Sequence, residues 1–126
     1  TLLIRLYRRL DRGADADAAF ATALRTAPDA AKRGAIALAY GEALTGVEKG
    51  IVTPAAKAAF DVALTSLPGD PAARYYRGLW LAQSGDVAGA LALWRAIEKD
   101  GPADAPWREK LKSDIERLAR EAPRPR

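Results

Sequence analysis

Apolar residues recur at intervals of three or four along most of the chain, with polar and charged residues between them. In the first segment, for example, Leu2, Leu3, Leu6 and Leu10 fall on one face of a helix. Alanine and leucine are abundant and β-branched residues are few, which favours helix over strand. The pattern predicts an all-α protein.

Capping and breaking residues divide this pattern into separate helices. Thr53 and Asp70 each stand directly before a proline, the arrangement of an N-cap followed by proline at the first helical position. Residues 122–126 follow the last periodic segment and are predicted to be a tail. The predicted helices cover about residues 2–12, 15–26, 30–45, 54–67, 71–84, 86–99 and 105–120.

One spacing of residue types occurs three times. It consists of an alanine, an aromatic residue, a small or aliphatic residue and a proline, at intervals of four, three and five. Alanine lets paired helices approach closely, the aromatic ring fills space between helix hairpins, and proline ends the second helix. We therefore predict three hairpins with their aromatic residues buried between them. The copies are Ala16, Phe20, Ala23, Pro28; Ala56, Phe60, Ala63, Pro68; and Ala90, Trp94, Ile97, Pro102.

This spacing resembles the tetratricopeptide repeat family, whose period is 34 residues. Ala56 and Ala90 are 34 residues apart, whereas Ala16 and Ala56 are 40 apart. We expect some of the extra residues in the loop at 46–51, so that Gly41 matches Gly78, and the others in the turn between the first two repeats.

The resemblance implies one domain over residues 1–121, a tetratricopeptide-repeat superhelix of three helix hairpins. The repeats would lie at about residues 1–28, 30–68 and 70–102, followed by a capping helix at about 105–120. Leu111, Ile115 and Leu118 should then face inward and cover the last hydrophobic face, while the charged residues of this helix face outward.

Composition narrows the available chemistry. The chain has no cysteine, histidine or methionine, which excludes disulfides, thiol nucleophiles and imidazole bases. Its Asp and Glu residues stand largely at helix starts and in loops, where capping explains them. We therefore expect no enzyme activity, no catalytic residue, no metal site and no cofactor.

The charge pattern argues against nucleic acid as a partner. The formal net charge is +4, with 20 basic and 16 acidic residues, but the charges mostly alternate in sign instead of forming a basic patch. The chain begins at Thr1 and has no apolar run near the ~18 residues that span a bilayer. We expect a soluble fragment without a membrane segment, cut from a longer protein.

Three further segments resemble the C-terminal periplasmic domain of the cytochrome c-type biogenesis proteins CcmI and CycH. They are AYGEALTGVEKGIVTPAAKAAFDVAL at 39–64, DPAARYYRGLWLAQSGDVAGALALWRAI at 70–97 and DAPWR at 104–108. The resemblance implies a periplasmic domain of a protein anchored in the inner membrane. It also implies a chaperone that holds apocytochrome c by its C-terminal helix until haem is attached. Other cytochrome c maturation proteins are further partners to consider.

Repeat spacing alone supports only a binding groove, and it leaves open a repeat scaffold for another bacterial envelope complex. The basic residues of the first hairpin are equally compatible with a solvated face. Of two adjacent tyrosines, we expect Tyr75 rather than Tyr76 to face the groove. The predicted groove residues are Arg5, Arg8, Arg9, Leu38, Glu42, Thr45, Tyr75, Leu79, Ala82 and Gln83.

Overall fold

A computed structural model describes residue 15 and residues 17–121. This part of the chain contains helices and no strand, which confirms the all-α prediction. The first predicted helix, Ala16 and the tail at 122–126 lie outside the described residues. Residues 17–26 are helical and are followed by α2 (Ala30–Val47), α3 (Pro54–Ser66), α4 (Pro71–Gln83), α5 (Val87–Asp100) and α6 (Arg108–Glu121).

Side-chain caps begin four of these helices. In each, an oxygen of the capping side chain accepts a hydrogen bond from the backbone N–H three residues later, at 2.7–3.2 Å. The bond satisfies one of the N–H groups that the first helical turn leaves without a partner. The starts predicted at Thr53 and Asp70 are thereby confirmed. The four caps are Asp29, Thr53, Asp70 and Asp86.

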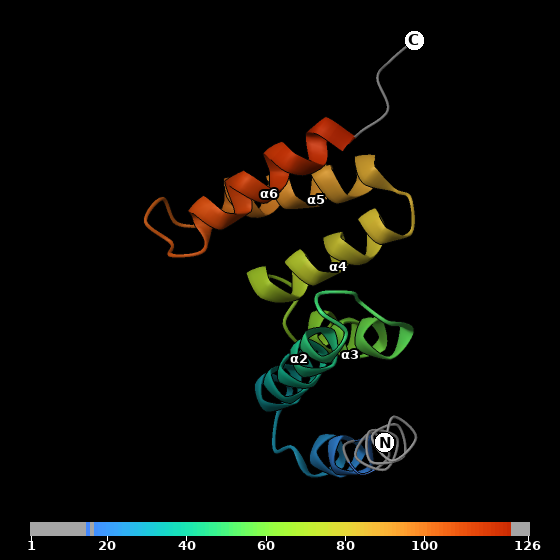
Figure 1. The fold of residues 1–126 in the computed structure, drawn as a ribbon. Helices are drawn as coiled ribbons and strands as arrows, with labels where there is room; N and C mark the ends of the chain where they lie inside the picture. The colour runs from blue at the N-terminus through green and yellow to red at the C-terminus, as the bar shows by residue number, and fades with distance from the viewer. Residues whose placement is uncertain (1–14, 16, 122–126) are drawn as a thin grey trace, which may run out of the picture.

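The helices pair as hairpins, α2 with α3 and α4 with α5, and α6 packs against α5. Figure 1 shows the pairs stacked along one direction, with residues 17–26 at one end and α6 at the other. This is the arrangement of a tetratricopeptide-like helical repeat, in which each hairpin contacts mainly its neighbours.

In the two hairpins formed by α2–α3 and α4–α5, an aromatic ring packs on a glycine of the facing helix. A Cβ built on Gly41 would lie 2.5 Å from the Phe60 ring, and one built on Gly78 would overlap the indole of Trp94. The predicted match of Gly41 with Gly78 is therefore confirmed. The aromatic residues thus fill the interior of their own hairpins, and not only the space between hairpins as predicted.

Burial of the three aromatic residues differs along the repeat. Phe60 and Trp94 are 1% and 4% exposed, as predicted for core residues. Phe20 is only half-buried, and its ring stacks on Tyr40 with centroids 4.1 Å apart. It packs at the edge of a cluster of small buried alanines and not within it. The prediction of full burial is wrong for Phe20.

The extra residues of the long repeat lie in two places. The connection from α2 to α3, residues 48–53, is longer than the α4–α5 connection at 84–86, as expected. It turns through Lys49 and Gly50, both at positive φ, and the Gly50 N–H donates to the Thr45 carbonyl at 2.9 Å. The other extra residues lengthen α2, which has 18 residues against 13 in α4. They do not lie in the preceding turn, which is a correction to the prediction.

The capping helix begins at Arg108, three residues later than predicted. Pro106 disfavours helical backbone at Ala105, which explains the later start. Leu111, Ile115 and Leu118 are buried against α5, as predicted. One charged residue of α6, Asp114, is buried as well, contrary to the expectation that its charges all face outward.

Candidate peptide-binding pocket

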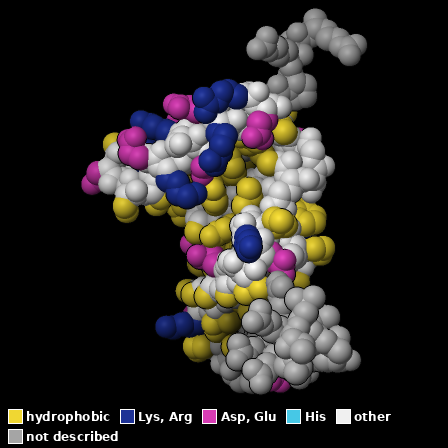
Figure 2. Space-filling view, viewed as in Figure 1, with side chains coloured by type: hydrophobic (Ala, Val, Ile, Leu, Met, Phe, Trp, Pro, Cys, Tyr) yellow, Lys and Arg dark blue, Asp and Glu magenta, His cyan; other side chains and the backbone are white. Residues whose placement is uncertain are grey.

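A pocket of about 220 Å³ opens between α2, α4 and α6. Its wall is mainly aromatic and aliphatic, with one acidic and one basic residue. Figure 2 shows Lys and Arg side chains gathered over α6 and hydrophobic side chains exposed beneath them. The lining residues are Glu42, Pro71, Ala72, Tyr75, Tyr76, Ile97, Trp107, Lys110 and Leu111.

The two tyrosines of α4 are held in place by rings behind them. Tyr75 stacks on Trp94 with centroids 5.0 Å apart, and Tyr76 stacks on Phe60 at 4.5 Å. The two tyrosine rings meet edge to face at 5.5 Å. Both tyrosines line the pocket, whereas the sequence led us to expect only Tyr75 to face the groove.

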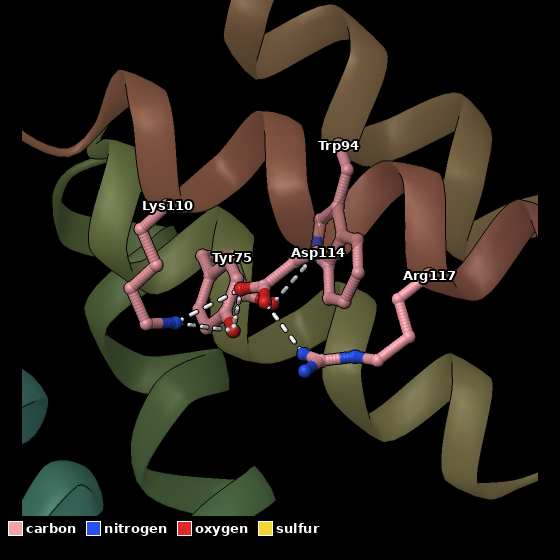
Figure 3. A network of polar contacts seen from close by, with 5 residues as sticks. All are labelled: Tyr75, Trp94, Lys110, Asp114 and Arg117. Atoms are coloured by element: carbon pink, nitrogen blue, oxygen red, sulfur yellow. Dashed lines mark hydrogen bonds and ion pairs between the residues drawn. The ribbon is translucent and has the colours of Figure 1, made fainter.

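A polar network joins α6 to α4 beside this pocket (Figure 3). The Tyr75 hydroxyl donates to Asp114 Oδ2 at 2.7 Å, and Lys110 Nζ donates to the same oxygen at 2.9 Å and to the Tyr75 hydroxyl at 3.0 Å. Arg117 donates to Asp114 Oδ1 at 2.6 Å. Trp94 also belongs to this cluster, because its indole N–H donates to the Tyr75 carbonyl at 3.0 Å. The network fixes the side chains of Tyr75 and Lys110 relative to the pocket.

The network also fixes the charge states of its members. Burial by itself raises the pKa of Asp114, but hydrogen bonds from Lys110 and Tyr75 and the charges of Lys110 and Arg117 outweigh burial and hold this pKa below its ordinary value. Burial lowers the pKa of Lys110, yet its hydrogen bonds to Tyr75 and Asp114 leave this pKa above the ordinary value. Burial, together with Asp114, raises the pKa of Tyr75 despite the hydrogen bond from Lys110. At neutral pH the cluster therefore holds a carboxylate, an ammonium group and a neutral phenol.

The α2 side of the pocket carries the opposite charge. Burial raises the pKa of Glu42, and the nearby charge of Asp70 raises it further. Burial also raises the pKa of Tyr76, with a contribution from the Glu42 charge. The pocket therefore lies between an acidic group on α2 and a basic group on α6.

Four other described residues of the predicted groove, Leu38, Thr45, Leu79 and Ala82, pack into the fold. Leu38, Leu79 and Ala82 are partly buried and pack against the core clusters. Thr45 is buried, and its hydroxyl donates to the Gly41 carbonyl at 2.8 Å. It is therefore not available to a partner, contrary to the prediction that it faces the groove.

Gln83 has a structural role that its repeat position did not indicate. Its side-chain oxygen accepts from the Val52 N–H at 2.9 Å, and its amide N–H donates to the Val52 carbonyl at 3.1 Å. An amide supplies both a donor and an acceptor, so it can pair with one residue's backbone in this way. Gln83 therefore ties the end of α4 to the loop before α3.

Three predicted residues, Arg5, Arg8 and Arg9, lie outside the described part of the chain. Of the remaining predicted residues, Glu42 and Tyr75 line the pocket. Sequence reasoning missed Trp107, Lys110 and Leu111, because it treated the capping helix only as a cover for the core. The tryptophan in DAPWR at 104–108 was the one available signal.

Two curated proteins are similar to this chain, and both are named cytochrome c-type biogenesis protein CycH. The protein from Rhizobium meliloti (strain 1021) is 40% identical over 119 residues, which cover 94% of this chain and 30% of the relative. The protein from Bradyrhizobium diazoefficiens is 40% identical over 78 residues, which cover 62% of this chain and 21% of the relative. The chain resembles CycH. No family model and no solved structure matches it.

The comparison confirms the resemblance to the CcmI and CycH proteins that the sequence segments indicated. The chain spans less than a third of the length of either CycH relative. Over residue 15 and residues 17–121, the CycH-like chain has no cluster of acidic residues suited to a metal ion. No helix in the same residues combines the length and the apolar character needed to cross a bilayer.

Proposed function

We propose that this chain is a peptide-binding domain for c-type cytochrome maturation. Its pocket takes the C-terminal helix of apocytochrome c and holds the unfolded protein for haem attachment. The similarity to proteins named for cytochrome c-type biogenesis supports the process. The pocket between α2, α4 and α6 is the observation that supports binding of a peptide.

The size and lining of the pocket suit a side chain better than a metabolite. Small-molecule sites usually occupy ~300–1,000 Å³, more than the 220 Å³ seen here. A helix that docks in a groove inserts a few apolar anchors at helical spacing. Burying one leucine or phenylalanine contributes roughly 1.5–3 kcal/mol, which suits a complex that must later release its partner.

The proposed role is holding and not catalysis. The charged groups at the pocket, Glu42 and Lys110, lie on different helices, and within the described residues no hydrogen bond joins them. The chain also has no histidine or cysteine to act as a base or nucleophile. We further propose that the domain works in the periplasm as part of a membrane-anchored protein, as the resemblance to CcmI and CycH implies.

A pocket-filling substitution tests this function. The 126-residue chain is titrated by calorimetry with a synthetic peptide of a c-type cytochrome C-terminal helix, and with a scrambled peptide of the same composition. Ala72 lines the pocket, and Ala72→Leu should weaken binding at least about tenfold by occupying the space. Ala58→Leu is the matched control, because Ala58 is exposed on α3 and does not line the pocket.

The result separates this function from a general scaffold. Specific binding that Ala72→Leu weakens and Ala58→Leu does not is the expected outcome. If the cytochrome peptide binds no better than the scrambled one, the domain serves another partner and the proposal is wrong.

A further inference from the structure

We propose that the pocket recognises one large apolar side chain together with a neighbouring carboxylate, which binds Lys110, and that Glu42 receives a basic or N-terminal group. The partner helix would then bind in one orientation only. This inference rests on the proposed function and adds to it the chemistry that the partner must present.

The cluster beside the pocket carries an excess of positive charge. Two cations, Lys110 and Arg117, share the single carboxylate of Asp114, at 2.9 and 2.6 Å. The fourth polar member, Tyr75, is neutral at physiological pH. The cluster therefore carries one net positive charge, and its member Lys110 lines the mainly apolar pocket, where a partner carboxylate would compensate that charge.

Lys110 is placed to meet that carboxylate. Its ammonium group has three donors, and two of them bond to the Tyr75 hydroxyl and to Asp114. The group also lies 4.7 Å from the centre of the Tyr75 ring, which restrains it further. The side chain is nevertheless 70% exposed. A restrained donor loses less conformational entropy on binding than a free lysine would.

Arg117 differs from Lys110 in one respect that matters here. Both are exposed cations on α6 that pair with Asp114, but only Lys110 lines the pocket. In Figure 3 the two side chains approach Asp114 from different sides. The chain therefore contains its own matched control for the charge of Lys110.

The acidic group on the α2 side of the pocket determines the orientation in which a partner helix binds. Glu42 stands on α2 and Lys110 on α6, and α4 lies between these two helices (Figure 1). A helix carries partial positive charge at its N-terminal end and partial negative charge at its C-terminal end. A partner helix with its C-terminal end toward α6 and its N-terminal end toward α2 matches both charges.

The experiment changes the partner first. Three synthetic peptides of a cytochrome C-terminal helix are titrated into the 126-residue chain: one with a free C-terminal carboxylate, one with a C-terminal amide, and one with its last glutamate changed to glutamine. Loss of the relevant carboxylate should weaken binding roughly 3- to 10-fold, and the effect should shrink with added salt. The amide and the glutamine peptide distinguish a terminal carboxylate from a side-chain carboxylate as the source.

Matched variants of the chain then test whether Lys110 binds the partner carboxylate. Lys110→Ala should weaken binding of the carboxylate peptide about as much as loss of the carboxylate does, and should remove the difference between the peptides. Arg117→Ala also removes a cation from Asp114 but leaves the Lys110 donor in the pocket, so it should weaken binding less than Lys110→Ala does. Glu42→Gln should weaken binding of peptides that carry a basic N-terminal half, whereas Glu116→Gln, an exposed change on α6, should not.

Each outcome decides between the two proposals. Equal effects of Lys110→Ala and Arg117→Ala, or equal affinity for all three peptides, would overturn the recognition of a carboxylate while leaving peptide binding intact. Failure of every peptide to bind the unmodified chain would overturn this inference and the proposed function together.

Discussion

The carboxylate of Asp114 is 6% exposed and accepts hydrogen bonds from two helices, α6 and α4. Its neighbours on α6, Lys110 and Arg117, are 70% and 65% exposed, so the cluster is a buried anion covered by solvated cations. Such an arrangement stabilises the docking of the capping helix only while the carboxylate is charged. Asp114 is therefore the residue whose ionisation should affect the stability of the domain most.

We predict that Asp114→Asn lowers the free energy of unfolding at pH 7 by about 1–3 kcal/mol, because Lys110 and Arg117 lose their charged acceptor. The folded-state pKa of Asp114 is depressed, so its contribution is present above the unfolded value of ~3.9 and is lost as pH falls through the folded pKa. Denaturant unfolding at pH 7 and at pH 3 measures both effects.

The variant should therefore lose less stability than the unmodified chain between these two pH values. Glu116→Gln, an exposed change on the same helix, provides the control and should behave like the unmodified chain. An identical acid response of Asp114→Asn and the unmodified chain would show that Asp114 does not contribute to stability through its charge.

At the scale of elements, the contact of α4 with α5 depends on a position without a side chain. The backbone of Gly78 lies against the indole of Trp94, which is itself stacked on Tyr75. Trp94 is held in place, because its indole N–H donates to the Tyr75 carbonyl and its ring packs in the hydrophobic cluster that α5 and α6 share. The spacing of the two helices is therefore set by this glycine.

We predict that Gly78→Ala destabilises the domain by about 1–3 kcal/mol, even though alanine is the better helix former by about 1 kcal/mol, because the added methyl group overpacks the contact. Gly46→Ala in α2 is the control, since a Cβ there has no neighbour within 4 Å. It should stabilise the domain by about 0.5–1 kcal/mol. Thermal unfolding of both variants checks the pair, and a stabilising Gly78→Ala would mean that α4 and α5 do not pack as closely as described.

Helix starts were well predicted at this scale and helix faces less so. An N-cap before proline acts through local backbone groups, so Thr53 and Asp70 could be recognised without knowing the fold. The side toward which Leu79 or Gln83 points depends on neighbouring helices, and no local rule supplies that information.

At the scale of the whole molecule, the composition limits what the domain can bind. The chain has no histidine, cysteine or methionine, and of the common protein ligands of haem iron it retains only tyrosine. We predict that the chain alone does not bind haem tightly. Titration with stoichiometric haem should leave the Soret band unshifted, and a shifted band that saturates at one equivalent would contradict the prediction.

The sequence by itself determined the helical class, most helix starts and the repeat, because these depend on local capping, helix propensity and the spacing of apolar residues. It also indicated the likeness to CcmI and CycH, since that likeness resides in short segments of fixed residue types. Only the tertiary structure decided the pocket. Glu42, Tyr76 and Lys110 come together from three helices, and the ionisation of Asp114 depends on groups that packing brings near it. Such groups are far apart along the chain, and their distances are set by how the hairpins stack.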